Sequence, residues 1–401
     1  MTPAEQTLIR LLRRGERARS KGGGERAALA MTPASCPEYG RLESLEAREA
    51  FHARIALAER EGAIEVERAR FGEERLLRLR LADLDRLAAH LGIRLLSDRV
   101  GEAAAMLDTA TGDWPIVASV LEAWRLGRKV RGSGPEAARD LFDATTVAGD
   151  RIHEERDERL LRRESIRLFD DSKRLERLTP WLDLLLAGDL APSGLSREEV
   201  WASLGLRRAP QPMLVSGVGT VVLRGEATPA TLPLVRPYLG LPIEAVETVA
   251  ARARYVLTIE NLASFHDAAA AVSLPGHADG LLIYTAGMPS PAWRALYGRI
   301  LRALPTGTAV LHWGDIDEGG FRIAASLASV AADAGRPLLP WLMSPSDLAT
   351  RPEGCTPPTP ATLRRMQHWA RRAGWASLAS GLELDPLELE QEALAPVFPM
   401  A

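Results

Sequence analysis

The chain of 401 residues carries 50 basic and 53 acidic side chains, a formal net charge of −3, and 46% apolar residues. The length predicts two or three domains, and the composition is that of a soluble globular protein rather than a disordered one. The balanced charge argues against a uniformly basic nucleic-acid binder. No run has the length of a membrane span or the form of a secretory signal, so we expect a cytoplasmic protein.

The two cysteines, Cys36 and Cys355, lie far apart in the sequence. They provide neither a disulfide framework nor a Cys-x-x-Cys zinc site, and the seven histidines are scattered without HExxH spacing. A zinc site is therefore not expected. Oxygen ligands are the remaining option for a metal.

Residues 1–135 predict an N-terminal arm with a winged-helix-like module. Residues 45–62, "LEAREAFHARIALAEREG", have apolar positions at helical spacing and end in a glycine. In the following "AIEVERARFGEERLLRLRL", apolar and polar residues alternate on both sides of Gly72. This pattern predicts a hairpin. A helix followed by a hairpin is the end of a winged helix, a fold that binds DNA in some proteins and other proteins elsewhere.

Residues 136–240 lie beyond the loop "RGSGPE" and contain the basic segment "RLLRRESIRLFDDSKRLERLTPWLDLLL". Its apolar positions alternate with the basic residues Arg163, Arg167, Lys173, Arg174 and Arg177. These side chains form either a solvated helix face or a surface that contacts phosphate groups. The sequence alone leaves both interpretations open.

Later in residues 136–240, the sequence predicts a second helix followed by a hairpin. "SREEVWASLGL" predicts a helix with a capping box at Ser196, and "QPMLVSGVGTVVLRG" predicts two short strands about Gly217 and Gly219. We therefore interpret residues 136–240 as a second, winged-helix-like domain.

Residues 241–401 predict an α/β domain. The apolar strands "RYVLTIEN", "GLLIYTAG", "TAVLHWGD" and "PLLPWLM" alternate with the helices "LASFHDAAAAV", "PAWRALYGRILRAL" and "GGFRIAASLASVAADAG". In the first of these helices we expect Leu262, Phe265, Ala269 and Val272 to face inward. This alternation predicts a parallel sheet covered by helices on both faces, with ligands at the carboxyl ends of its strands.

Three acidic residues follow two of these strands. Glu260 closes the first strand, and Asp315 and Asp317 close the third. If those strands are neighbours, the three carboxylates meet at one edge, where like charges are costly unless they are protonated or bridged by Mg²⁺ or Mn²⁺. Alternatively, Asp317 accepts amide hydrogen bonds as the N-cap of the next helix, which explains one acid and leaves Glu260 and Asp315 unexplained.

Four stretches carry a family resemblance. "TIENLASF", "HWGDIDEGGFRI", "SIRLFDDSKRLE" and "YLGLPIEAVETV" resemble JetD, the nuclease subunit of Wadjet anti-plasmid systems and a relative of the topoisomerase VI A subunit. The resemblance covers most of residues 40–345. It implies a multidomain α+β and α/β protein with an N-terminal arm, a winged-helix (CAP-like) domain and a C-terminal Toprim domain, acting as a homodimer.

The resemblance also implies a function. The family cuts double-stranded plasmid DNA delivered by an SMC-like ATPase complex with kleisin-like and KITE-like subunits, which places it with the nucleoid or plasmid. It implies that Glu260, Asp315 and Asp317 are catalytic and hold Mg²⁺ or Mn²⁺, with Glu318 and Asn261 as further candidates. The DNA-contacting residues would include Arg163, Arg167, Lys173 and Arg174.

One departure from the topoisomerase branch bears on the chemistry. There a winged-helix tyrosine attacks the phosphodiester, whereas none of the tyrosines of this chain lies within residues 140–210; they are Tyr39, Tyr238, Tyr255, Tyr284 and Tyr297. We therefore expect hydrolysis by metal-activated water. Two alternatives stay open, namely a transesterase that uses a tyrosine from elsewhere, such as Tyr238, and a non-catalytic DNA-binding adaptor.

Overall fold

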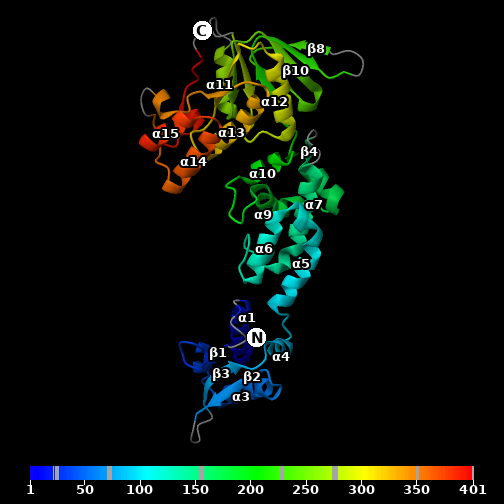
Figure 1. The fold of residues 1–401 in the computed structure, drawn as a ribbon, viewed down its shortest axis with the longest axis vertical. Helices are drawn as coiled ribbons and strands as arrows, with labels where there is room; N and C mark the ends of the chain where they lie inside the picture. Colours follow the sequence, from blue (N-terminus) through cyan, green and yellow to red (C-terminus); the bar gives the residue numbers. More distant parts are fainter. Residues whose placement is uncertain are drawn as a thin grey trace. The chain divides into compact units, whose positions relative to one another are not determined.

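The computed structural model describes residues 1–20, 22, 27–69, 75–152, 158–225, 230–272, 279–348 and 352–399. The chain divides into a first unit, Met1–Thr146 with Pro180–Ser193, and a second unit, Val147–Thr179 with Gly194–Ala401 (Figure 1). Within the described part of the chain, the helices are too short or too polar to span a bilayer.

The elements of the first unit are mostly helical. In chain order they are α1 (Pro3–Ser20), β1 (Ala28–Ala30), α2 (Pro37–Gly40), α3 (Leu45–Arg60), β2 (Ile64–Arg68), β3 (Leu76–Leu81), α4 (Leu84–Leu91), α5 (Leu96–Asp113), α6 (Pro115–Arg125), and α7 (Ala138–Ile152), which continues into the second unit.

A small sheet with the strand order β1-β3-β2 organises the first 95 residues. Side chains from α1, α3 and β3 form its core, including Leu8, Leu11, Ile55 and Leu79. The predicted helix over 45–62 is confirmed as α3, and the predicted hairpin as the antiparallel pair β2–β3. The turn around Gly72 lies outside the described residues.

Helices α5 and α6 follow, and a pair of tryptophans fixes the end of α6. The indole of Trp124 is fully buried and lies edge-on against Trp181, with 6.0 Å between ring centroids. Its Nε1–H donates to the carbonyl oxygen of Ser133 at 3.0 Å. The loop after α6 is therefore tied to the helix that precedes it.

The second unit contains the remaining elements. They are β4 (Arg159–Leu160), α8 (Leu161–Phe169), α9 (Arg174–Ala187), whose last turns belong to the first unit, α10 (Arg197–Ser203), β5 (Leu206–Arg207), β6 (Met213–Ser216), β7 (Gly219–Leu223), β8 (Ala230–Pro233), β9 (Leu239–Leu241), β10 (Val246–Ala251), β11 (Tyr255–Ile259), α11 (Leu262–Val272), β12 (Gly280–Tyr284), α12 (Pro291–Ala303), β13 (Ala309–Trp313), α13 (Glu318–Asp333), β14 (Leu338–Pro340), α14 (Pro360–Arg372) and α15 (Ala376–Leu384).

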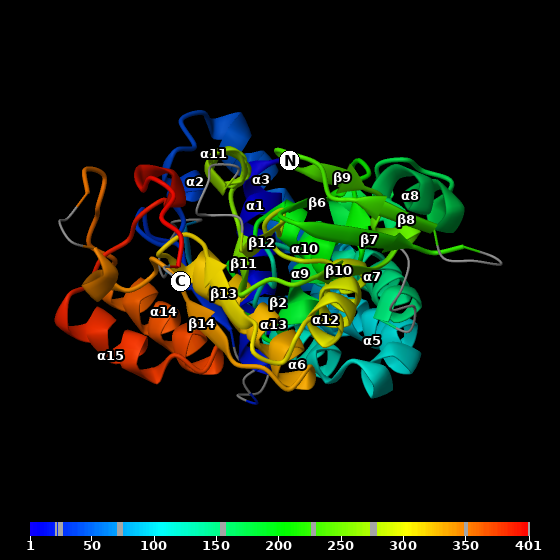
Figure 2. The same cartoon turned by 90° about the horizontal axis from the view of Figure 1, so that it is seen from above.

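A six-stranded mixed sheet with the order β14-β13-β11-β12-β6-β9 is the centre of the second unit. The predicted parallel arrangement is confirmed for β14, β13, β11 and β12, while β6 and β9 extend the sheet antiparallel. Figure 2 shows α11 on one face, with α12 and α13 on the other. All five residues of β11 are buried, which is the pattern of a central strand covered on both faces.

The predicted hairpin about Gly217 and Gly219 is wrong. β6 joins the six-stranded sheet beside β12, whereas β7 pairs with β8 and β10 in a separate three-stranded sheet. The chain changes sheets at Gly217, which has a φ of +142° and a position where a Cβ atom would lie 2.7 Å from the carbonyl oxygen of Gly280. Two alternating strands joined by a short turn do not by themselves specify which partner each will take.

Two further predictions in this unit concern the cap of α10 and the inward face of α11. The capping box at Ser196 is confirmed, because its hydroxyl accepts the Glu199 amide while the Glu199 carboxylate accepts the Ser196 amide. On α11, Phe265 and Ala269 are buried as predicted, but Leu262 is 51% exposed because it lies at the first turn, beyond the sheet edge. The side chain of Val272 lies outside the described residues.

Candidate functional site

The acidic residues singled out in the sequence lie at the carboxyl ends of two adjacent parallel strands. β11 and β13 are neighbours, with Ile259 opposite Trp313 in the register. The condition set in the sequence analysis, that these two strands are neighbours, is therefore met. Glu260 and Asp315 therefore leave the same edge of the sheet.

Glu260 and Asp315 are in contact through the backbone. The Asp315 amide donates to Oε2 of Glu260 at 3.3 Å. Gly314 makes room for this arrangement, since a Cβ atom there would lie 2.5 Å from the same oxygen and 3.0 Å from Nε2 of His312. The glycine of the "WGD" sequence is thus required by the position of the Glu260 carboxyl group.

Asp317 lies one turn further and caps α13. Its Oδ1 accepts the Gly320 amide at 2.7 Å, so the N-cap interpretation is confirmed as a hydrogen bond. This hydrogen bond uses Oδ1 of the Asp317 carboxyl group and not Oδ2. Glu318 begins α13, and its Oε2 accepts from Nε of Arg365 at 2.5 Å.

A C-terminal segment that the sequence analysis left without a role completes this edge. Gln391 is 1% exposed, and its amide donates to Oδ1 of Asp315 at 2.7 Å. Its side chain bridges the two strand ends, since Nε2 donates to the Trp313 carbonyl at 3.0 Å and Oε1 accepts the Asn261 amide at 2.7 Å. The segment is therefore fixed against both β11 and β13.

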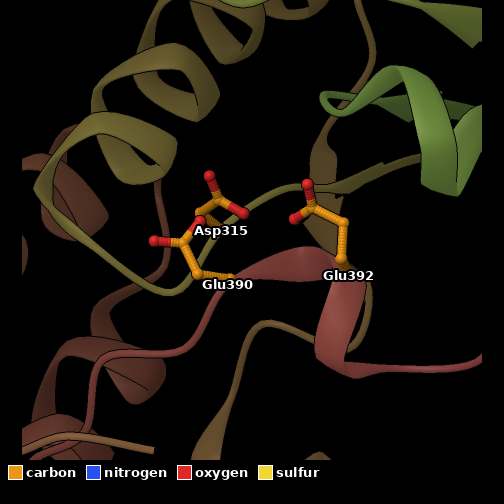
Figure 3. A group of neighbouring side chains, drawn as sticks. All are labelled: Asp315, Glu390 and Glu392. Atoms are coloured by element: carbon orange, nitrogen blue, oxygen red, sulfur yellow. The ribbon is translucent and has the colours of Figure 1, made fainter. Parts of the chain in front are cut away.

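Gln391 is flanked by two acids that gather with Asp315. Carboxylate oxygens of Asp315, Glu390 and Glu392 lie within 4.8 Å of one another, and Figure 3 shows the two glutamates on the C-terminal segment beside Asp315. Nδ2 of Asn261 donates to Oε1 of Glu392. The alternating acids of "LELEQEAL" were the signal in the sequence, but nothing there placed them beside Asp315.

The sequence-predicted acids do not all enter this closest group. Among the described residues, the group of three acids that meets this distance contains Asp315 but neither Glu260 nor Asp317. Glu260 is linked to it through the Asp315 amide, and Asp317 through the loop between β13 and α13. The structure thus brings Glu260 and Asp315 together and leaves Asp317 partly occupied by its helix.

Burial and mutual repulsion make the charged forms of these acids costly. Burial, with the nearby charges of Asp315 and Asp317, raises the pKa of Glu260 well above its usual value. Burial also raises the pKa of Asp315 to about 7, with Asp317, Glu390 and Glu392 adding to the effect, and it raises the pKa of Asp317. Arg322 partly offsets this effect at Asp317, whereas burial and neighbouring acids dominate at Glu260 and Asp315, an electrostatic condition that a divalent cation satisfies.

The donor set fits Mg²⁺ or Mn²⁺. Both metals prefer carboxylate oxygens, and the residues at this edge offer oxygen atoms from Glu260, Asp315, Glu390 and Glu392. Gly314 keeps the space beside Glu260 free of a side chain. Holding a cation is therefore consistent with both the chemistry and the packing of this edge.

We expect the stability of the metal-free protein to fall as the pH rises from about 4 to about 7. Asp315 and Glu260 have pKa values above 3.8 and 4.5 in the folded chain, so the folded state binds more protons than the unfolded state in this interval. The stabilising effect of protonation is complete when the pH is below the pKa values of the unfolded chain. It is lost as the pH rises through the pKa values of the folded chain. Urea denaturation in EDTA across this interval measures it.

Two controls accompany the pH experiment. The Asp315→Asn substitution should flatten the pH dependence because the amide does not titrate. Mn²⁺ should restore stability at the alkaline end by about 3 kcal/mol at a hundredfold excess over its dissociation constant. A metal-free protein whose stability does not change over this interval would show that the carboxyl groups are not destabilised.

We expect Gly320→Ala to destabilise the protein by about 1–3 kcal/mol, the usual cost of forcing an extra atom into packed structure. A Cβ atom on Gly320 would overlap the backbone carbonyl oxygen of Asp315, so the loop carrying Asp315 has to move. Gly319→Ala is the matched control, because its Cβ atom would lie 3.3 Å from Oδ1 of Asp317. Equal denaturation midpoints for the two variants would contradict the close approach at Gly320.

A cleft of about 730 Å³ opens beside the acidic edge. Its lining includes Glu260 and Asp315 together with Tyr238, His266 and Tyr284. The Tyr238 ring packs at 5.4 Å from Phe265 and 5.9 Å from His266, measured between centroids. Acidic and aromatic side chains therefore both line this cleft.

The predicted DNA-contacting residues lie on α8 and around the start of α9. They differ in how exposed their side chains are and in whether an acidic residue already pairs with them. Arg163 on α8 and Lys173 before α9 are exposed. Arg167 is occupied, because its guanidinium pairs with Asp150 at 2.5 Å and with Glu164, which raises its pKa. Arg174, the first residue of α9, is half-buried.

Comparison with known families identifies the C-terminal part of the chain. The family described as "Wadjet protein JetD, C-terminal" matches residues 219–398, a range that contains the acidic edge and the six-stranded sheet except for β6. A comparison with curated proteins found no match. JetD is a protein of the Wadjet anti-plasmid defence system. Residues 219–398 of this chain therefore match the C-terminal domain of the Wadjet protein JetD.

Proposed function

We propose that the protein is a metal-dependent endonuclease subunit of a Wadjet-type complex that cleaves plasmid DNA by hydrolysis. The observation that carries the proposal is the acidic edge, where Glu260 and Asp315 meet at the ends of adjacent parallel strands with raised pKa values. Such perturbed carboxyl groups beside a cleft are typical of catalytic metal sites. The match to JetD supplies the plasmid as the target.

In this proposal the second unit carries a Toprim domain on the six-stranded sheet, and helix-and-strand modules before it are winged helices. The α3–β2–β3 arrangement supports the first of these assignments. The protein acts as a homodimer, together with an SMC-like ATPase complex containing kleisin-like and KITE-like subunits. These partners follow from the family resemblance of the sequence.

The chain's own residues have distinct tasks in this proposal. Glu260, Asp315 and Asp317 hold Mg²⁺ or Mn²⁺, joined by Glu390 and Glu392 on the C-terminal segment. A bound divalent ion would neutralise charge on the scissile phosphodiester and lower the pKa of the attacking water. Glu318 is a weaker candidate ligand than the others, because it is engaged by Arg365.

The test is incubation of the purified protein with supercoiled plasmid and Mn²⁺ or Mg²⁺, followed by electrophoresis with and without protease. Linear DNA free of protein, formed only in the presence of metal, is the expected product. The same reaction in the presence of the SMC-like partner complex establishes whether the isolated subunit is restrained. Absence of cutting in both conditions would contradict the proposal.

Two other functions have a specific observation in their favour. Tyr238 lines the cleft beside Glu260, which is where a transesterase nucleophile would lie. Such an enzyme would leave a covalent protein–DNA adduct that persists in denaturing gels and disappears with protease. For the second function, a DNA-binding adaptor without catalytic metal, the supporting observation is that Asp317 caps α13 by a hydrogen bond. Such an adaptor would bind no Mn²⁺ in equilibrium dialysis.

We expect charge reversal at Arg163 and Lys173 to weaken DNA binding and reduce its salt dependence. Both side chains are exposed, so both are available to phosphate oxygens, and each lost contact lowers the slope of log K against log salt by about 0.9. Fluorescence anisotropy at several salt concentrations measures both effects. Arg177→Glu is the control, because Arg177 is also exposed but pairs with Asp171. Identical slopes in all variants would place the DNA elsewhere.

A further inference from the structure

A second cavity, of about 550 Å³, lies in the first unit and is bordered by basic side chains. Arg13 and Arg17 reach it from α1, Arg99 from α5, and Arg128 and Lys129 from the loop after α6. Arg13 and Arg17 are four residues apart on one helix, so they lie on the same face. Three separate elements therefore direct cations to one hollow.

The acids of this cavity are already used by the backbone. A carboxylate oxygen of Glu16 accepts the Leu96 amide at 2.6 Å, and one of Glu136 accepts the Gly134 amide at 2.8 Å. Hydrogen bonds from its own amide and from the Gly134 amide, with the nearby charges of Arg99 and Lys129, lower the pKa of Glu136. Glu16 and Glu136 thus hold the walls in place through amide groups, and Glu136 also pairs with Arg99 at 3.8 Å.

Arg13, Arg17 and Arg128 have exposed side chains and make no side-chain hydrogen bond or ion pair with any residue that the structure describes. This contrasts with the other arginines of the first unit, most of which have an acidic partner; the pairs include Arg10–Glu38, Arg19–Asp85, Arg54–Glu5, Arg94–Glu102, Arg125–Glu122, Arg131–Asp183 and Arg139–Asp143. Unpaired exposed arginines also occur elsewhere in the first unit, such as Arg41 and Arg78, but at the cavity three of them lie around one hollow.

The wall behind these cations is rigid. Trp124 lines the cavity, is fully buried, and is fixed both by its hydrogen bond to Ser133 and by its edge-on contact with Trp181. The loop carrying Arg128 and Lys129 is connected directly to this residue. A site built on such a support loses little conformational entropy when a ligand binds.

We propose that this cavity binds phosphate groups of the DNA backbone. Arginine suits this ligand because its planar guanidinium donates two parallel hydrogen bonds to phosphate oxygens. The choice of DNA as the source of the phosphates rests on the proposed function, whereas the preference for a phosphate-bearing ligand rests on the unpaired arginines. The site lies in the first unit and needs no metal.

The experiment measures binding of a short fluorescent DNA duplex in EDTA, where cleavage does not interfere, so loss of nuclease activity has no bearing on it. The double variant Arg13→Glu/Arg128→Glu should raise the dissociation constant about tenfold or more and reduce the slope of log K against log salt by about 2. The Arg13→Lys/Arg128→Lys double, which keeps the charge, should retain most of the affinity. Circular dichroism melting establishes that each variant is folded.

A matched control is Arg41→Glu/Arg78→Glu, which changes the net charge equally at two exposed positions of the first unit outside the cavity. It should leave affinity and slope close to those of the wild type. Equal effects of the two charge-reversal doubles would overturn the proposal, as would no effect of the first. A fluorescent nucleoside triphosphate forms the last arm: loss of its binding in Arg13→Glu/Arg128→Glu with unchanged DNA binding would overturn DNA as the ligand.

Discussion

We expect Glu260→Gln to reduce metal-dependent plasmid cleavage by at least about a thousandfold. The substitution keeps the size of the side chain and an oxygen that can accept the Asp315 amide, so the packing at the strand ends is preserved. It removes one negative charge from the proposed metal site, and loss of several kcal/mol of transition-state stabilisation corresponds to this factor. Initial rates of plasmid linearisation with Mn²⁺ measure the effect.

Stability provides an independent readout for the same variant. Because the pKa of Glu260 is raised well above its usual value, its charge is unfavourable in the metal-free folded chain. Glu260→Gln should therefore unfold at the same or a higher urea concentration than wild type in EDTA at neutral pH, while gaining less stability from Mn²⁺. Glu244→Gln, at an exposed glutamate of the same unit, is the control. Cleavage at the wild-type rate by the Glu260 variant would remove it from the site.

We expect Gln391→Leu to lower cleavage by about 10- to 100-fold, the usual cost of losing a group that supports metal ligands. The leucine leaves the Asn261 amide without its present partner, removes one of the two hydrogen bonds to the Trp313 carbonyl, and releases the segment that carries Glu390 and Glu392. Each unsatisfied buried group costs about 1–3 kcal/mol. Plasmid cleavage measures the functional loss, and hydrogen exchange at the Gln391 amide measures release of the segment.

Gln367→Leu is the matched control for Gln391→Leu. Gln367 is also buried, and its Nε2 donates to the Ala379 carbonyl at 3.2 Å, between α14 and α15. A similar loss of stability without loss of cleavage is expected. The Glu390→Gln/Glu392→Gln double separates charge from position: it should weaken Mn²⁺ binding while the segment stays in place. If both glutamine-to-leucine variants cut plasmid at the wild-type rate, the C-terminal segment has no role at the site.

The parallel part of the sheet could be predicted because β11, β12 and β13 are short, apolar and each followed by a helix. That pattern indicates parallel strands joined by right-handed crossovers, but it does not fix their order, so the neighbouring positions of β11 and β13 became known only from the structure. The antiparallel strands β6 and β9 could not be placed in the same way. Their alternating side chains fit any exposed sheet edge, and the edge offered by β12 became visible only in the folded chain.

At the candidate site, Glu260 and Asp315 could be predicted because each directly follows a strand. The contribution of Gln391 could not, because its position depends on the fold of the intervening helices α13, α14 and α15 rather than on a local pattern. Gln391 lies 131 residues after Glu260, yet its side chain accepts the amide of Asn261, the residue next to Glu260. The first and third glycines of "WGDIDEGG", Gly314 and Gly320, likewise acquired a physical role only when their neighbours were known.

The bridge formed by Gln391 also orders events during synthesis. The ribosome releases the chain from its amino end, so β11 and β13 emerge well before residues 388–392. Until that segment arrives, the Trp313 carbonyl and the Asn261 amide lack the partner that joins the two strand ends, and Asp315 lacks the Gln391 amide. A nascent chain therefore carries the acids of the strand ends before it can assemble the complete edge, which places completion of the site among the last steps of its maturation.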